Sequence, residues 1–111
     1  MKYNLDKLNE LSGGDKEFNQ TIITTFLQET PEDFKGLESA IAAQDFSAIY
    51  QYAHKIKPNA DLLGIDKLKD QMLTIESHAR GDMDIERIKG LSSSAADELQ
   101  TAYQELSNYI K

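Results

Sequence analysis

The sequence contains no cysteine, so disulfide bonds, thiolate metal sites and cysteine-based catalysis are all excluded. It also has no apolar run near the ~18–20 residues that a membrane span requires. Its 12 basic and 19 acidic residues give a net charge of −7, which makes nucleic acid and membrane surfaces poor candidate partners. The N-terminal stretch MKYNLDKLNEL lacks the apolar centre and cleavage pattern of a signal peptide. A soluble cytoplasmic protein is therefore expected.

Proline and glycine are scarce, with two and six copies, and no low-complexity tract or long linker interrupts the chain. Apolar residues recur at steps of three and four almost throughout, and no stretch alternates as a half-buried strand would. The pattern predicts an all-α fold, and the length of 111 residues is typical of one domain, residues 1–111.

The N-terminal half predicts two or three helices. A short helix is expected at about residues 4–11, ended by Ser12-Gly13-Gly14. Asp15 can cap a second helix. Residues 30–33, Thr-Pro-Glu-Asp, have the pattern of a helix start, and the sequence leaves open whether they begin a new helix or kink the second one. The buried stripe of the second helix is expected to be Phe18, Ile22, Ile23, Phe26 and Leu27.

The C-terminal half predicts three further helical segments. Asp45 opens the first, whose apolar positions are spaced like the seam of a helical bundle, and Gly64 is expected to end it. The next carries Leu68, Met72 and Ile75. The last is expected to start between residues 84 and 94, and the serines at 92–94 are interpreted as a turn or helix cap. Short connections favour antiparallel neighbours, so we expect an antiparallel up-down four-helix bundle with a short accessory N-terminal helix.

One histidine, His54, follows directly after Ala53, which lies on the apolar seam of the helix that Asp45 opens. Each helical residue advances about 100°, so the imidazole is expected at the edge of the seam, on the bundle surface. Taken alone, it would most simply be a solvated histidine between two surface lysines, Lys55 and Lys57. The chain has no P-loop, no glycine-rich kinase loop and no paired Glu-x-x-His ligands, so no metal, ATP or other cofactor is expected.

The segment at 53–65, AHKIKPNADLLGI, closely resembles the phosphorylation motif of histidine-containing phosphotransfer (HPt) domains. That motif runs histidine, any residue, an apolar residue, lysine, glycine, and then a small-polar stretch ending in Leu-Gly. Residues 11–15 with Phe18 resemble the N-terminal segment of the family, and residues 26–31 resemble the end of its second helix. Ile75-Glu76 falls where the family often has an apolar residue followed by Glu or Gln. The resemblance therefore touches most of the chain.

The resemblance implies a phosphocarrier of a multistep His-Asp phosphorelay, and not an enzyme. His54 would accept a phosphoryl group from a receiver-domain aspartate and pass it to another, while the receiver supplies the metal and catalytic groups. Lys57, one turn further on, is the expected cation for the phosphoryl group, with Lys55 pointing further round the helix. The expected partners of this monomer are receiver domains of hybrid histidine kinases and response regulators. The expected partner-binding residues, beside exposed apolar residues of the short N-terminal helix, are Tyr50, Gln51, Pro58, Asp61 and Glu76.

Two residues depart from that picture. Pro58 stands where the family usually has glycine, and its missing N–H predicts a local kink. Asp61, two turns after His54, would oppose a phosphoryl group unless Lys57 pairs with it. Both favour an alternative, a helical adaptor that binds receiver or other signalling domains without carrying phosphate. His78 is expected to be a surface histidine favoured by a helix C-terminal dipole.

Overall fold

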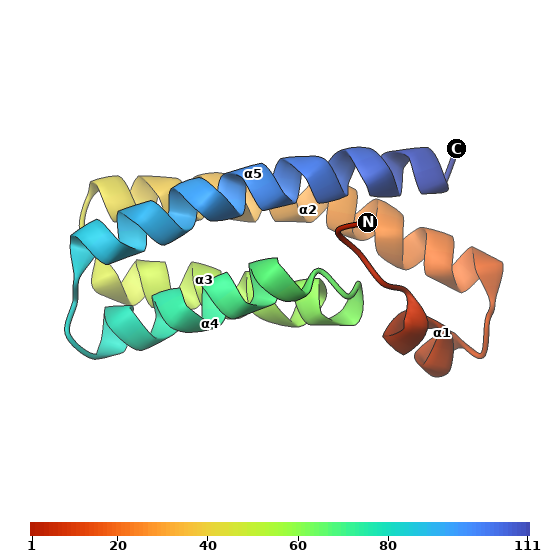
Figure 1. The fold of residues 1–111 in the computed structure, drawn as a ribbon, viewed down its shortest axis with the longest axis horizontal. Helices are drawn as coiled ribbons and strands as arrows, with labels where there is room; N and C mark the ends of the chain where they lie inside the picture. Colours follow the sequence, from red (N-terminus) through yellow and green to blue (C-terminus); the bar gives the residue numbers. More distant parts are fainter.

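The computed structural model describes residues 1–111 as five helices and no strands, which confirms the all-α prediction. The helices are α1 Asp6–Ser12, α2 Lys16–Ala42, α3 Phe46–Leu62, α4 Asp66–Arg80 and α5 Ile85–Tyr109. The four long helices run alternately up and down, with α2 and α5 in one layer and α3 and α4 in the other (Figure 1). Each packs on its two neighbours in the ring α2–α3–α4–α5, while α1 lies at one end against α2. None of these helices is long and apolar enough to cross a membrane.

Aspartate caps set three of the four long-helix starts. Asp15 accepts hydrogen bonds from the backbone of Glu17 and Phe18, which begins α2 as predicted. Asp45 begins α3 in the same way. Asp84 caps α5 and places its start at the earliest position that the sequence allowed. These carboxylates accept from backbone N–H groups that have no partner within the helix, so the capping aspartates determine where the elements begin.

Pro31 neither starts a helix nor ends one, because α2 continues through it from Lys16 to Ala42. Thr30 is buried inside the helix, where the sequence pattern had predicted a possible cap, and its hydroxyl makes no hydrogen bond. Phe26 and Phe34, which lie before and after Pro31 in α2, are both buried in the same core. This shared packing holds the parts of α2 on the two sides of Pro31 against the bundle. Helix α3, which carries the histidine, is therefore the third helix of the chain and follows a single long α2.

The core contains 22 buried apolar side chains from all five helices and the α3–α4 connection. One prediction about side-chain burial and one about a turn or helix cap were wrong. Phe18 is 40% exposed, because the first turns of α2 project beyond the ends of α3 and α4 (Figure 1). The serines at 92–94 lie inside α5, where Ser92 is buried and Ser94 accepts a hydrogen bond from Gln71 of α4 at 2.8 Å. Ser94 therefore belongs to an α4–α5 contact, and the three serines lie within a helix and not in a turn or at a cap.

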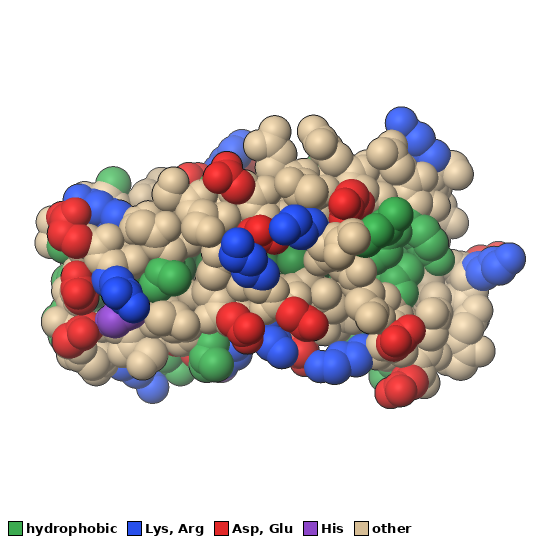
Figure 2. Space-filling view, in the orientation of Figure 1, with side chains coloured by type: hydrophobic (Ala, Val, Ile, Leu, Met, Phe, Trp, Pro, Cys, Tyr) green, Lys and Arg blue, Asp and Glu red, His purple; other side chains and the backbone are tan.

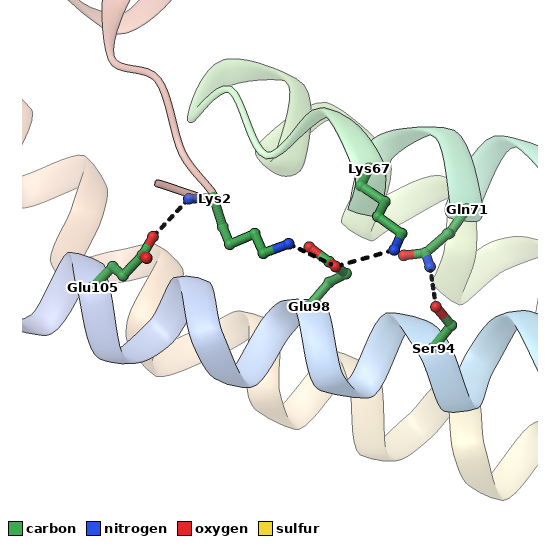
Figure 3. Close-up of polar contacts among 6 residues, drawn as sticks. All are labelled: Lys2, Lys67, Gln71, Ser94, Glu98 and Glu105. Atoms are coloured by element: carbon green, nitrogen blue, oxygen red, sulfur yellow. Dashed lines mark hydrogen bonds and ion pairs between the residues drawn. The ribbon is translucent and has the colours of Figure 1, made fainter.

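The N-terminal segment is tied across the bundle by polar contacts, which Figure 3 shows together. The side chain of Lys2 meets Glu98 of α5 at 3.2 Å, and Lys67 of α4 reaches the same carboxylate at 3.3 Å. Gly64 ends α3 with φ +65°, and the backbone of Asn4 donates to the carbonyl of Leu63 beside it at 3.0 Å. The start of the chain is thereby held against the end of α3, far along the bundle from the middle of that helix.

Candidate functional site

His54 lies in the middle of α3 with 60% of its side chain exposed. The buried positions of this helix are Ile49, Ala53, Ile56 and Ala60, which form the seam against the core. The seam fixes the rotation of α3, and His54 falls just outside it. The prediction of an imidazole at the edge of the bundle surface is therefore confirmed.

Glu76 of the neighbouring helix α4 orients the imidazole ring of His54. Its carboxylate oxygen Oε2 lies 3.2 Å from Nδ1 of His54, and its side chain is only 8% exposed. An ionised carboxylate can only accept a hydrogen bond, so the neutral ring carries its proton on Nδ1. The lone pair is then on Nε2, in the exposed half of the ring. This arrangement leaves an oriented and exposed ring nitrogen on the surface of the bundle.

Lys57 holds the other oxygen of the same carboxylate. Its ammonium group lies 2.8 Å from Oε1 of Glu76, and its side chain is 27% exposed. The sequence predicted that Lys57 would bind the phosphoryl group on His54 unless it paired with Asp61. In the structure its side chain extends toward α4 and pairs with Glu76. The ammonium group of Lys57 and the imidazole of His54 thus both face one largely buried carboxylate, and a buried charge is costly without such partners.

Lys55 turns away from the histidine, as the sequence predicted. It donates to Asp33 of α2 at 2.9 Å, and this hydrogen bond, with the charge of Asp33, raises the pKa of Lys55 above its usual value. The side chain of Asp33 is only 11% exposed, so its carboxylate depends on the charge of Lys55. The two lysines beside the histidine therefore bind to different neighbouring helices.

Tyr50 and Arg80 extend the site by one helical turn. The Tyr50 ring stacks beside the His54 ring, with centroids 5.6 Å apart and planes at 11°. The guanidinium carbon of Arg80, at the end of α4, lies 3.6 Å from the centroid of the Tyr50 ring. Sequence analysis named Tyr50 but missed Arg80. The signal was available in the spacing, since Arg80 is one turn after Glu76 and on the same helix face.

The remaining predicted partner-binding residues are spread along α3. Gln51 and Pro58 are exposed, and α3 runs on past Pro58 to Leu62. Asp61 pairs with Lys7 of α1 at 2.6 Å, and Lys57 pairs with Glu76 instead of Asp61. The hydrogen bond from Lys7 lowers the pKa of Asp61. Seven residues separate Asp61 from His54, about 10 Å along the helix. Helix α1 therefore lies toward the end of α3, and the expectation that it borders the histidine was wrong.

His78 lies in a different setting. Its Nδ1 is 2.8 Å from Asp82, and its side chain is 19% exposed, so it is more buried than the sequence suggested. The hydrogen bond from His78 lowers the pKa of Asp82. No three histidine, aspartate or glutamate side chains lie close enough together to hold a metal ion. The largest surface groove, between α2 and α5, is lined by none of the residues around His54.

Comparison with known proteins agrees with this geometry. The family model described as the Hpt domain matches residues 21–109, which include all of the residues around His54. The chain is also similar to the phosphorelay intermediate protein rdeA of Dictyostelium discoideum, with 22% identity over 110 residues. That alignment covers 99% of this chain and 43% of the Dictyostelium protein, so the chain spans less than half the length of this relative. With a family match over most of its length and a helical bundle that presents an oriented histidine, the chain belongs to the Hpt domain family.

Proposed function

We propose that the chain is a phosphocarrier of a His-Asp phosphorelay, in which Nε2 of His54 accepts a phosphoryl group from a receiver aspartate and passes it to another. The observation that carries the proposal is the contact between Nδ1 of His54 and the buried carboxylate of Glu76, with the opposite side of the ring exposed. Membership of the Hpt domain family and the name of the Dictyostelium relative support it. The proposal treats residues 1–111 as one domain, because all five helices contribute to one core.

The reaction follows from the proton on Nδ1. The Nε2 lone pair attacks the phosphorus of the aspartyl phosphate, the N–P bond forms, and the P–O bond breaks with its electron pair going to the aspartate carboxylate. Nδ1 keeps its proton, so the phosphorylated ring is a cation. Glu76 faces that cation at hydrogen-bond distance and stabilises it as it forms. In the second half-reaction another aspartate carboxylate attacks the same phosphorus and the neutral imidazole leaves.

The same surface provides the docking site in this proposal. Gln51 and Pro58 are exposed on α3 to either side of the histidine. Leu73 of α4 is 53% exposed and lies one turn before Glu76, so it adds an apolar contact at the edge of the site. By resemblance to the family, the receiver contributes the metal and most of the transition-state stabilisation. A contact of this transient kind buries roughly 1,000–1,200 Å² in total.

The test is incubation of the chain with receiver domains that carry a labelled aspartyl phosphate. Wild-type chain and His78→Gln should acquire label that is labile in acid and stable in base, as expected for phosphohistidine. His54→Gln should keep the helical content and melting temperature and acquire none. Label that persists in His54→Gln would refute the assignment. Receiver binding without any label on the wild type would instead support the adaptor alternative.

A further inference from the structure

The cations around His54 differ in how firmly they are held. A phosphoryl group on Nε2 brings about −2 charges to an exposed position and needs a positive partner. Three cationic side chains lie close enough to be considered, namely Lys55, Lys57 and Arg80. The two lysines pair with carboxylates that are 11% and 8% exposed. Moving either lysine to a phosphoryl group would leave a largely buried carboxylate without its cation, which is costly.

Arg80 is different because it makes no ion pair with any carboxylate. Its guanidinium lies on the ring of Tyr50, and Tyr50 stacks beside His54. The distance from the guanidinium carbon to the centre of the imidazole ring therefore cannot exceed the sum of these two distances, 3.6 Å and 5.6 Å. Arg80 is an exposed residue at the end of α4.

We infer that Arg80 is the phosphoryl-binding cation of this site, held on Tyr50 until His54 is phosphorylated and then moved onto the phosphoryl oxygens. The inference rests on the proposed function. Its chemical basis is that a guanidinium offers two parallel N–H donors to a phosphoryl group, a stronger interaction than its contact with the partly buried ring of Tyr50. Tyr50 is then a positioning residue, which keeps the guanidinium beside the histidine and away from the acidic groups elsewhere on the surface.

The movement of Arg80 can be observed directly, because the chain has only two arginines. The Nε–Hε signals of Arg80 and Arg87 in a ¹H–¹⁵N spectrum can be assigned with Arg87→Gln. The Arg80 signal should lie upfield in the free chain through the ring current of Tyr50 and should lose that shift in Tyr50→Leu. Phosphorylation of His54 with phosphoramidate should move it downfield, while the Arg87 signal stays in place. An Arg80 signal that does not respond would overturn the inference.

The transfer equilibrium gives an independent test. At equilibrium the ratio of phosphorylated chain to phosphorylated receiver, both free in solution, does not depend on how tightly the two dock. Arg80→Gln should lower this ratio about tenfold, the effect of losing one charge-assisted contact, and Arg80→Lys should lower it less. Arg87→Gln, an exposed arginine at the start of α5, is the matched control and should leave the ratio unchanged.

The outcomes separate the inference from the proposed function. If wild-type His54 takes no label from either phosphoramidate or a receiver, both are wrong. If the wild type is labelled and Arg80→Gln has the same equilibrium ratio as Arg87→Gln, only the role of Arg80 is wrong. A slower transfer with an unchanged ratio would mean that Arg80 contacts the receiver and not the phosphoryl group, which also overturns the inference.

Discussion

Replacing Lys57 by methionine tests whether the carboxylate beneath the histidine depends on its lysine. The sequence suggested that Lys57 is a surface lysine, whereas the structure places its ammonium group 2.8 Å from Glu76 with only 27% of the side chain exposed. Methionine keeps most of the apolar stem and removes the charge. Any loss of stability then reports the ion pair and not a cavity.

The size of the effect follows from the distance and the burial. At 2.8 Å and an effective dielectric constant near 20, the direct attraction is about 6 kcal/mol. Desolvation of the 8% exposed carboxylate offsets most of it, so the net contribution falls between the ~0.2–1 kcal/mol of an exposed ion pair and the ~3–5 kcal/mol lost when a fully buried one is broken. Glu76 keeps its contact with His54 in the variant. We therefore expect Lys57→Met to lower the free energy of unfolding by about 2 kcal/mol and the melting temperature by roughly 8 °C.

Urea unfolding followed by circular dichroism measures this change. Lys35→Met is the control, because Lys35 pairs with Glu32 at 3.5 Å while both side chains are more than 70% exposed. It should cost less than about 0.5 kcal/mol. Combining Lys57→Met with Glu76→Gln should cost less than the two single changes added together. If Lys57→Met is no more costly than Lys35→Met, the carboxylate does not depend on this lysine and the reasoning is refuted.

Three further predictions concern the rest of the chain. Gly64→Ala should lower the free energy of unfolding by about 1–3 kcal/mol, because φ is +65° and a Cβ there would meet the backbone of Asn4; urea unfolding tests this, and an unchanged midpoint would contradict it. Burial opposes the charge of Glu98, but hydrogen bonds from two lysines outweigh this and lower the pKa of Glu98 below its ordinary value of 4.5. Its stabilisation is therefore complete above that value and is lost as the pH falls through the lower folded-state pKa; the stability difference between wild type and Glu98→Gln should shrink below pH 4.5, and a difference that grew there would have the wrong sign. Pro58→Ala should raise the free energy of unfolding by about 1–3 kcal/mol, since proline costs up to about 3 kcal/mol more than alanine in a helix interior; a lower melting temperature would mean that packing requires the proline ring.

The sequence was sufficient for features that depend on neighbours within one helix. Apolar spacing predicted the helices, and Asp15 and Asp45 marked two of their starts. Ala53 on the seam placed His54 at its edge, because the helical repeat alone relates adjacent residues. Resemblance of residues 53–65 to the HPt motif suggested the role that is proposed for His54, and resemblance at Ile75-Glu76 named Glu76 as part of the site.

Features that depend on contacts between helices were decided only by the tertiary structure. The continuity of α2 through Pro31 and the placement of three serines inside α5 reflect packing on neighbours that local pattern does not contain. The same holds at the site, where His54 and its carboxylate partner lie 22 residues apart and meet because α3 and α4 pack side by side. Both lysines beside His54 pair with carboxylates and Arg80 does not, and these pairings follow from how the helices are rotated about their axes. The periodicity of a single helix shows which face is buried, but it does not show which charged groups of another helix that face will meet.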